Sequence, residues 1–166
     1  MSNLYHTLEE VLVHKIALYT EIIEVMNDEW KSVSEYSREN LEKALQCKEI
    51  LLAKVHELNQ KREEVIRSIS EQVGQSHTAM TLKDIIGLKE NQWGNSMAVH
   101  RKKIIDQIQM IKELNSANKQ LINRSALAMK QSMSWLYEVD TDYTPYHSNG
   151  QLREPTMESR VVNTDV

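Results

Sequence analysis

Apolar side chains recur every three or four residues over long stretches of this chain, which is the spacing of one face of an α-helix. The first stretch covers roughly residues 3–33 and is interrupted by Lys15, whose long side chain can carry its charge to water. A second stretch continues to about residue 73, and a third runs from about 96 to 137. The pattern predicts three long helices.

Two irregular segments indicate how these helices connect. The first is Ser34-Glu35-Tyr36-Ser37, in which either serine could cap the next helix, and so short a connection implies an antiparallel hairpin. In the second, Gly74 to Asn95, Thr81 is followed three residues later by Asp84, the pattern of a capped helix start. We therefore expect an all-α fold: an antiparallel bundle of three long helices with a short extra helix near residues 81–90.

From Asp140 onward the helical periodicity stops, and Thr, Asp, Ser, Asn, Gly and Pro dominate. We divide the chain into a helical bundle domain, residues 1–137, and a flexible acidic tail, residues 138–166. The tail holds six acids against two arginines, and it alone accounts for the net charge of −4. The remaining residues are balanced in charge, which argues against a nucleic-acid-binding protein.

Several function classes find little support. Cys47 is the only cysteine, so the chain has no internal disulfide and no cysteine-based metal site. No acid lies three residues before any of the six histidines, as a di-iron helical bundle would require, and no phosphate-binding loop is present. We expect no enzyme activity, cofactor or metal. Without a signal peptide or an apolar run long enough to insert into a membrane, a cytoplasmic location is the simplest expectation.

The last predicted helix has an unusual apolar stripe, because two asparagines three residues apart, Asn115 and Asn118, lie on it. Such a polar pair could fix the helix register or contact a partner. Toward its end the stripe becomes rich in Ser and Met, which suits either a bundle core or a surface that repacks against a partner helix. The expected stripe consists of Val99, Ile104, Ile108, Ile111, Asn115, Asn118, Ile122, Ser125, Met129, Met133 and Leu136.

These residues carry a resemblance to a known family. The run Leu114-Asn115-x-x-Asn118-x-x-Leu121-Ile122, the Met/Ser-rich helix end and the later Tyr146-x-x-x-Gly150-Gln151 resemble the FlgN family of flagellar type III export chaperones. Weaker similarities are Lys48-Glu49-x-Leu51-Leu52 and Glu57-x-x-x-Lys61-Arg62 in the second helix, and Thr81-Leu82 before the last one. The resemblance spans most of residues 4–151.

The resemblance implies a small cytoplasmic chaperone that binds hook–filament junction proteins by a C-terminal helical segment. Such a chaperone prevents premature assembly of its client and delivers it to the export gate. On this basis we expect Tyr146 and Gly150 to dock at the gate, and Asn115 and Asn118 to be a structural signature that fixes register. We expect the client to bind Leu121, Ile122, Ser125, Met129, Met133 and Leu136.

The alternative is a structural coiled-coil adaptor with permanent partners and no chaperone role. It predicts a strict heptad pattern to the end of the last helix and stable self-association. A helical-bundle enzyme is a third interpretation, which a bound metal or cofactor would favour.

Overall fold

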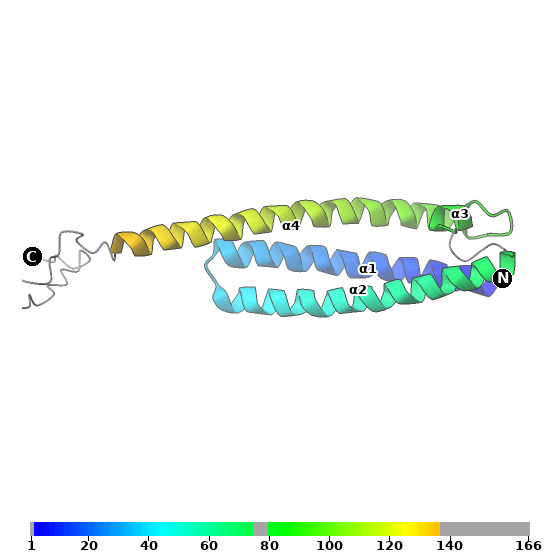
Figure 1. The fold of residues 1–166 in the computed structure, drawn as a ribbon, viewed down its shortest axis with the longest axis horizontal. Coiled ribbons are helices and arrows are strands. Elements are labelled where there is room, and N and C mark those ends of the chain that lie inside the picture. The colour runs from blue at the N-terminus through cyan, green and yellow to red at the C-terminus, as the bar shows by residue number, and fades with distance from the viewer. Residues whose placement is uncertain (1, 75–79, 137–166) are drawn as a thin grey trace, which may run out of the picture. The chain divides into compact units, whose positions relative to one another are not determined.

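The computed structural model describes residues 2–74 and 80–136, and this part of the chain contains four α-helices and no strand (Figure 1). They are α1 (Ser2–Ser34), α2 (Arg38–Val73), α3 (Leu82–Ile86) and α4 (Gly94–Leu136). The predicted fold of three long helices and one short helix is confirmed, with boundaries within a few residues of those expected. The expected flexible tail lies outside the described residues.

Contacts divide the chain into two compact units, Met1–Leu121 and a second unit that begins at Ile122. Helix α4 crosses this border. The domain border expected after residue 137 coincides with the end of the described residues and stays a prediction.

Helices α1 and α2 form the antiparallel hairpin that the short break predicted. Lys15 Nζ donates a hydrogen bond to Asn59 Oδ1 at 2.6 Å, and Lys48 Nζ lies 2.7 Å from a carboxylate oxygen of Glu29. Positions later in α1 thus meet positions earlier in α2. In the turn, Tyr36 adopts a left-handed φ of 54°.

Lys15 differs from the expectation that its charge would reach water. Its side chain is buried, with 6% of the residue exposed, and its ammonium group lies 5.5 Å from the ring centroid of Tyr19. Burial lowers the pKa of Lys15, and the nearby charge of Arg62 lowers it further. The hydrogen bond to Asn59 therefore partly compensates a charge held away from solvent.

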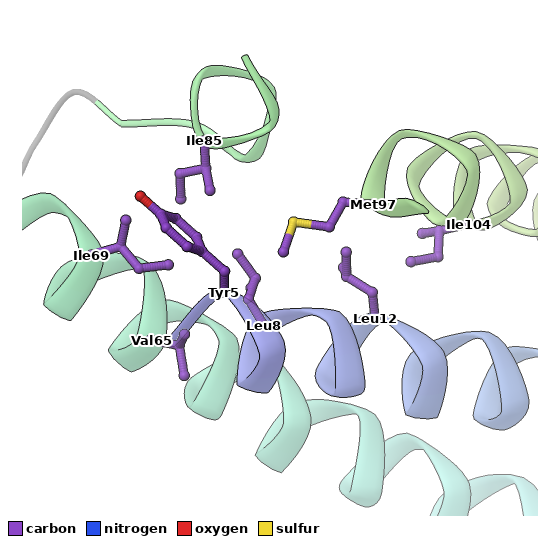
Figure 2. Close-up of a cluster of buried hydrophobic side chains, with 8 residues drawn as sticks. All are labelled: Tyr5, Leu8, Leu12, Val65, Ile69, Ile85, Met97 and Ile104. Carbon is purple, nitrogen blue, oxygen red and sulfur yellow. The ribbon is translucent and has the colours of Figure 1, made fainter. Parts of the chain in front are cut away.

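The main core lies where all four helices meet, and Figure 2 shows its side chains pointing toward one another. Each fully buried aliphatic side chain contributes about 1.5–3 kcal/mol to folding, so this cluster anchors the short helix as well as the long ones. Its members are Tyr5, Leu8 and Leu12 from α1, Val65 and Ile69 from α2, Ile85 from α3, and Met97 and Ile104 from α4. A second cluster on the hairpin contains Ile22, Met26, Leu51 and Val55.

The start of α3 confirms the predicted cap. Asp84 N donates to Thr81 Oγ1, and the Asp84 carboxylate accepts from the Thr81 backbone N–H at 2.8 Å, forming a capping box. Between α3 and α4 the backbones approach closely, since a Cβ on Gly94 would lie 2.6 Å from the carbonyl oxygen of Ile86.

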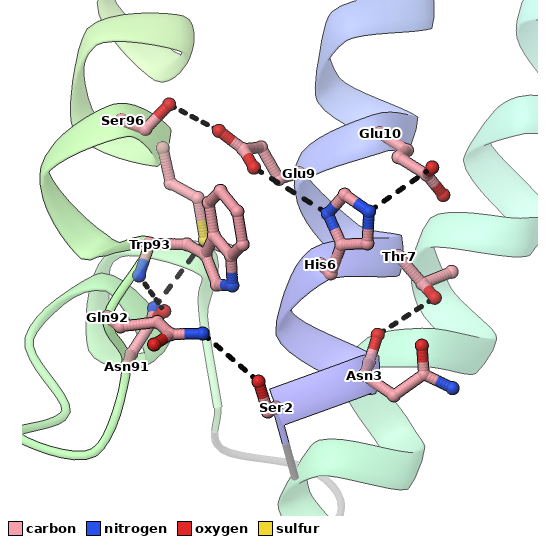
Figure 3. A network of polar contacts seen from close by, with 11 residues as sticks. Ser2, Asn3, His6, Thr7, Glu9, Glu10, Asn91, Gln92, Trp93 and Ser96 are labelled. Carbon is pink, nitrogen blue, oxygen red and sulfur yellow. Dashed lines mark hydrogen bonds and ion pairs between the residues drawn. The ribbon is translucent and has the colours of Figure 1, made fainter.

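Polar contacts join the first turns of α1 to the segment that begins α4 (Figure 3). Ser96 Oγ donates to a carboxylate oxygen of Glu9, and Gln92 Nε2 donates to Ser2 Oγ at 3.0 Å. The His6 ring stacks on Trp93 with centroids 5.1 Å apart. These contacts place the N-terminal ends of α1 and α4 together.

Candidate interaction face on helix α4

Two amide side chains set the position of α4 along α1 within the first unit. Gln107 Nε2 donates to the carbonyl oxygen of Ile16 at 3.1 Å and to Thr20 Oγ1 at 2.9 Å. Asn118 Nδ2 donates to the carbonyl oxygen of Met26 at 2.8 Å. The bonds to the two carbonyls join residues 91 and 92 positions apart, so α4 runs parallel to α1 in a constant register.

The two asparagines of the predicted signature have different surroundings. Asn118 is buried at 2% exposure, whereas Asn115 is exposed. They therefore do not form one buried polar pair, although Asn118 makes a contact of the kind that a register role requires. That role stays a prediction for both residues.

The buried side of α4 also differs from the stripe that we expected. Val99 is 67% exposed, while Gln107, which we had not singled out, is buried. The buried positions are Met97, Ile104, Gln107 and Asn118, together with Gly94. Gln107 lies three residues after Ile104 and so on the same side of the helix, but its polar side chain gave no sign of burial.

We use the name interaction face for the six residues predicted to bind a client: Leu121, Ile122, Ser125, Met129, Met133 and Leu136. Beyond Asn118, none of the α4 side chains that the structure describes is buried. Leu121 and Ser125 are half-buried, and Ile122, Met129 and Met133 are 38%, 67% and 48% exposed. The side chain of Leu136 lies outside the described residues.

Exposure of these apolar side chains favours a surface over a bundle core. Spacings of three and four residues place Ile122, Ser125, Met129 and Met133 on one side of the helix. Ala126, Met129, Lys130, Met133 and Ser134 lie together on an open stretch of this helix surface. Binding of a partner to this face stays a prediction, as does the docking role of Tyr146 and Gly150, which lie outside the described residues.

Helix α4 is strongly basic. It holds seven basic and two acidic residues, a formal charge of +5. Four of the seven basic residues share one side of the helix, whereas Lys102, Lys103 and Arg124 lie on other sides. We call these four the basic row: Arg101, Lys112, Lys119 and Lys130. Among the described residues, no acid forms an ion pair with any basic residue of α4.

Two further observations concern what the described residues lack. They contain no group of three His, Cys, Asp or Glu side chains placed to hold a metal ion. None of their helices combines the length and apolar character needed to cross a membrane.

Comparison with known proteins gives one match. The family model described as FlgN protein matches residues 1–154, which is almost the whole chain. No curated protein and no solved structure matches.

Proposed function

The chain belongs to the FlgN family of flagellar export chaperones, and from that premise we propose that it binds hook–filament junction proteins in the cytoplasm before their export. The observation that carries this proposal is the interaction face of α4, where Ile122, Met129 and Met133 are exposed on one side of a helix. An exposed apolar stripe at helical spacing suits an amphipathic helix of a client.

The proposed client contact is a C-terminal helical segment of the junction protein, which packs its apolar side against the interaction face. A segment that is disordered before assembly gains order on α4, and part of the interaction energy is spent on that ordering. The complex is then tight enough to keep the segment from assembling early and weak enough to release it. Methionine side chains adapt their shape, so one face can accept more than one junction protein.

The test replaces Met129 and Met133 with Asp together and measures binding to a purified junction protein by calorimetry. An unpaired carboxylate buried under a client helix should weaken binding by about 100-fold. Because both positions are exposed, the helical circular dichroism signal should stay unchanged. The control carries Asp at Val99 and Met110, which are exposed α4 positions outside the interaction face, and should bind normally.

Either of two results would count against this assignment. Unchanged affinity in the Met129/Met133 variant would place the client elsewhere. Loss of helicity in that variant would show that the two methionines contribute to the core rather than to a binding surface.

Delivery to the export gate is the second part of the proposal, and it assigns gate docking to Tyr146, together with Gly150. Tyr146 follows Pro145 in a polar, acidic segment, where one aromatic side chain can dominate a small interface. Tyr146→Ala should leave client binding intact and reduce secretion of the junction proteins. Equal losses of client binding and secretion would contradict a separate docking site.

A further inference from the structure

The charges of this chain are unevenly divided between helix α4 and the segment that follows it. Helix α4 has a formal charge of +5, and residues 137–166, which we call the acidic segment, have a charge of −4. In the α1–α2 hairpin, several basic side chains pair with acids, as Lys43 does with Glu39 at 2.6 Å. On α4 no described acid forms such a pair, so its basic side chains lack a local partner, although residues 1–93 carry an opposite net charge of −5.

The basic row runs beside the interaction face. Its members follow one another at intervals of 11, 7 and 11 residues, and such intervals turn by only about 20° on an α-helix. Lys119 lies three residues before Ile122, and Lys130 lies three residues before Met133, so each basic side chain neighbours an apolar one of the face. Lys130 also lies on the same open stretch of helix surface as Met129 and Met133.

We propose that the acidic segment lies along the basic row of α4 and competes with the client for the adjacent interaction face. The competition rests on the function proposed above, whereas the contact between the acidic segment and α4 does not. The segment would act as an internal occupant that a client must displace.

The chain is long enough for this contact. Lys130 and Lys119 lie about 9 and 26 Å back along the helix from Leu136. Asp142 and Glu154 follow Leu136 by 6 and 18 residues, which span at most about 20 and 60 Å. Acids of the segment can therefore come beside both lysines.

A covalently linked segment also has an advantage over a free acidic partner, because its effective concentration reaches the millimolar range. Each exposed ion pair changes an equilibrium by no more than about fivefold, and salt screens it. The contact should therefore be weak, dependent on several charges together and lost at high ionic strength. These are properties that suit an occupant that a client displaces.

The contact can be measured on the full chain without any client. Cys47 is the only cysteine, so Cys47→Ser with Ser148→Cys places one spin label in the acidic segment. At low salt the label should broaden the backbone NMR signals of α4 around Lys119 and Lys130, and about 1 M NaCl should restore them. No broadening at low salt, or broadening that persists in high salt, would overturn the proposal.

Matched variants test whether the basic row is responsible. Lys119→Gln with Lys130→Gln should reduce the broadening, whereas Lys102→Gln with Arg124→Gln removes the same charge from other sides of α4 and should preserve it. An equal reduction of the broadening in both double variants would show a general attraction to a basic helix and would refute the basic row as the contact site. Broadening seen only when labelled and isotope-enriched chains are mixed would assign the contact to a second copy, which also refutes the internal occupant.

The competition is tested with a neutralised acidic segment, Asp140→Asn, Asp142→Asn, Glu154→Gln and Glu158→Gln, in the full chain. This variant should bind a junction protein about fivefold more tightly than the wild type at low salt, with equal affinity in about 1 M NaCl. If the label reports the contact and the affinities are equal at low salt, the competition is refuted and the contact stands. If neither chain binds a junction protein, the proposed function fails, and the label experiment still decides the contact.

Discussion

Replacing Asn118 with Leu should raise the free energy of unfolding, although the substitution removes a hydrogen bond. The Asn118 side chain is buried, and its Nδ2 donates to the carbonyl oxygen of Met26 at 2.8 Å. Its Oδ1 is buried as well and has no hydrogen-bond partner among the described residues. The position therefore combines one satisfied polar group with one unsatisfied one.

The magnitude follows from these two groups. The hydrogen bond to Met26 contributes about 0.5–1.5 kcal/mol. Its loss does not leave the Met26 carbonyl oxygen unsatisfied, since a carbonyl inside α1 keeps its helical hydrogen bond. The unsatisfied Oδ1 costs about 1–3 kcal/mol, which the Leu variant recovers. Burial of the Leu side chain adds to this stabilisation, and its imperfect fit in the Asn118 site subtracts from it. We expect a net stabilisation of about 1–2 kcal/mol, or about 2–8 °C in Tm.

The assay is urea unfolding followed by circular dichroism, with Asn115→Leu as the matched control. Asn115 is exposed on the same helix, so its substitution should change stability by less than about 0.5 kcal/mol. If Asn118 also fixes the register, the Leu variant should gain stability while its α4 NMR signals broaden. A loss of more than about 1 kcal/mol in Asn118→Leu would refute the reasoning, because the hydrogen bond would then outweigh the unsatisfied oxygen.

Three further predictions concern the first unit. Leu8→Ala should cost about 2–5 kcal/mol in urea unfolding, since Leu8 is fully buried in the main core. A cost below about 1 kcal/mol would mean that neighbouring side chains close the cavity. Gly94→Ala should destabilise by more than about 1 kcal/mol despite the better helix propensity of Ala, because its Cβ would meet the Ile86 carbonyl; equal stability would show that the backbone yields. The pKa of Lys15 is lower in the folded chain than its ordinary value of 10.5. Between these two pKa values the unfolded chain binds more protons than the folded chain, so the free energy of unfolding should rise as the pH increases toward 10.5. Lys15→Met should remove this part of the pH dependence, and identical profiles would contradict it.

The helices could be predicted from sequence because their signals are local. Apolar periodicity located α1, α2 and α4, and the spacing of Thr81 and Asp84 located the start of α3. The hairpin followed from the length of its connection. In each case, residues close together in the chain determine the outcome.

The side of α4 that is buried could not be predicted in the same way. Periodicity identified an apolar stripe but not which neighbour covers it, and so it included the exposed Val99 and omitted the buried Gln107. Gln107 is buried because a carbonyl of α1, 91 residues earlier, meets its amide. A contact between residues so far apart leaves no mark in local spacing.

The same limit explains why the sequence could not decide whether the stripe near the end of α4 is core or surface. Spacings of three and four residues describe Ile104, which packs in the main core, as well as Met129, which is exposed. A helical segment without burial draws its stability from the helix it continues, since a short isolated helix is marginal in water. Residues 122–134 continue the packed part of α4 in this way. Covering their apolar side chains with another surface would lower the free energy further. The exposed stripe of α4 thus shares the spacing of the core but lacks its covering neighbours, and the client and the acidic segment are the two partners proposed to cover it.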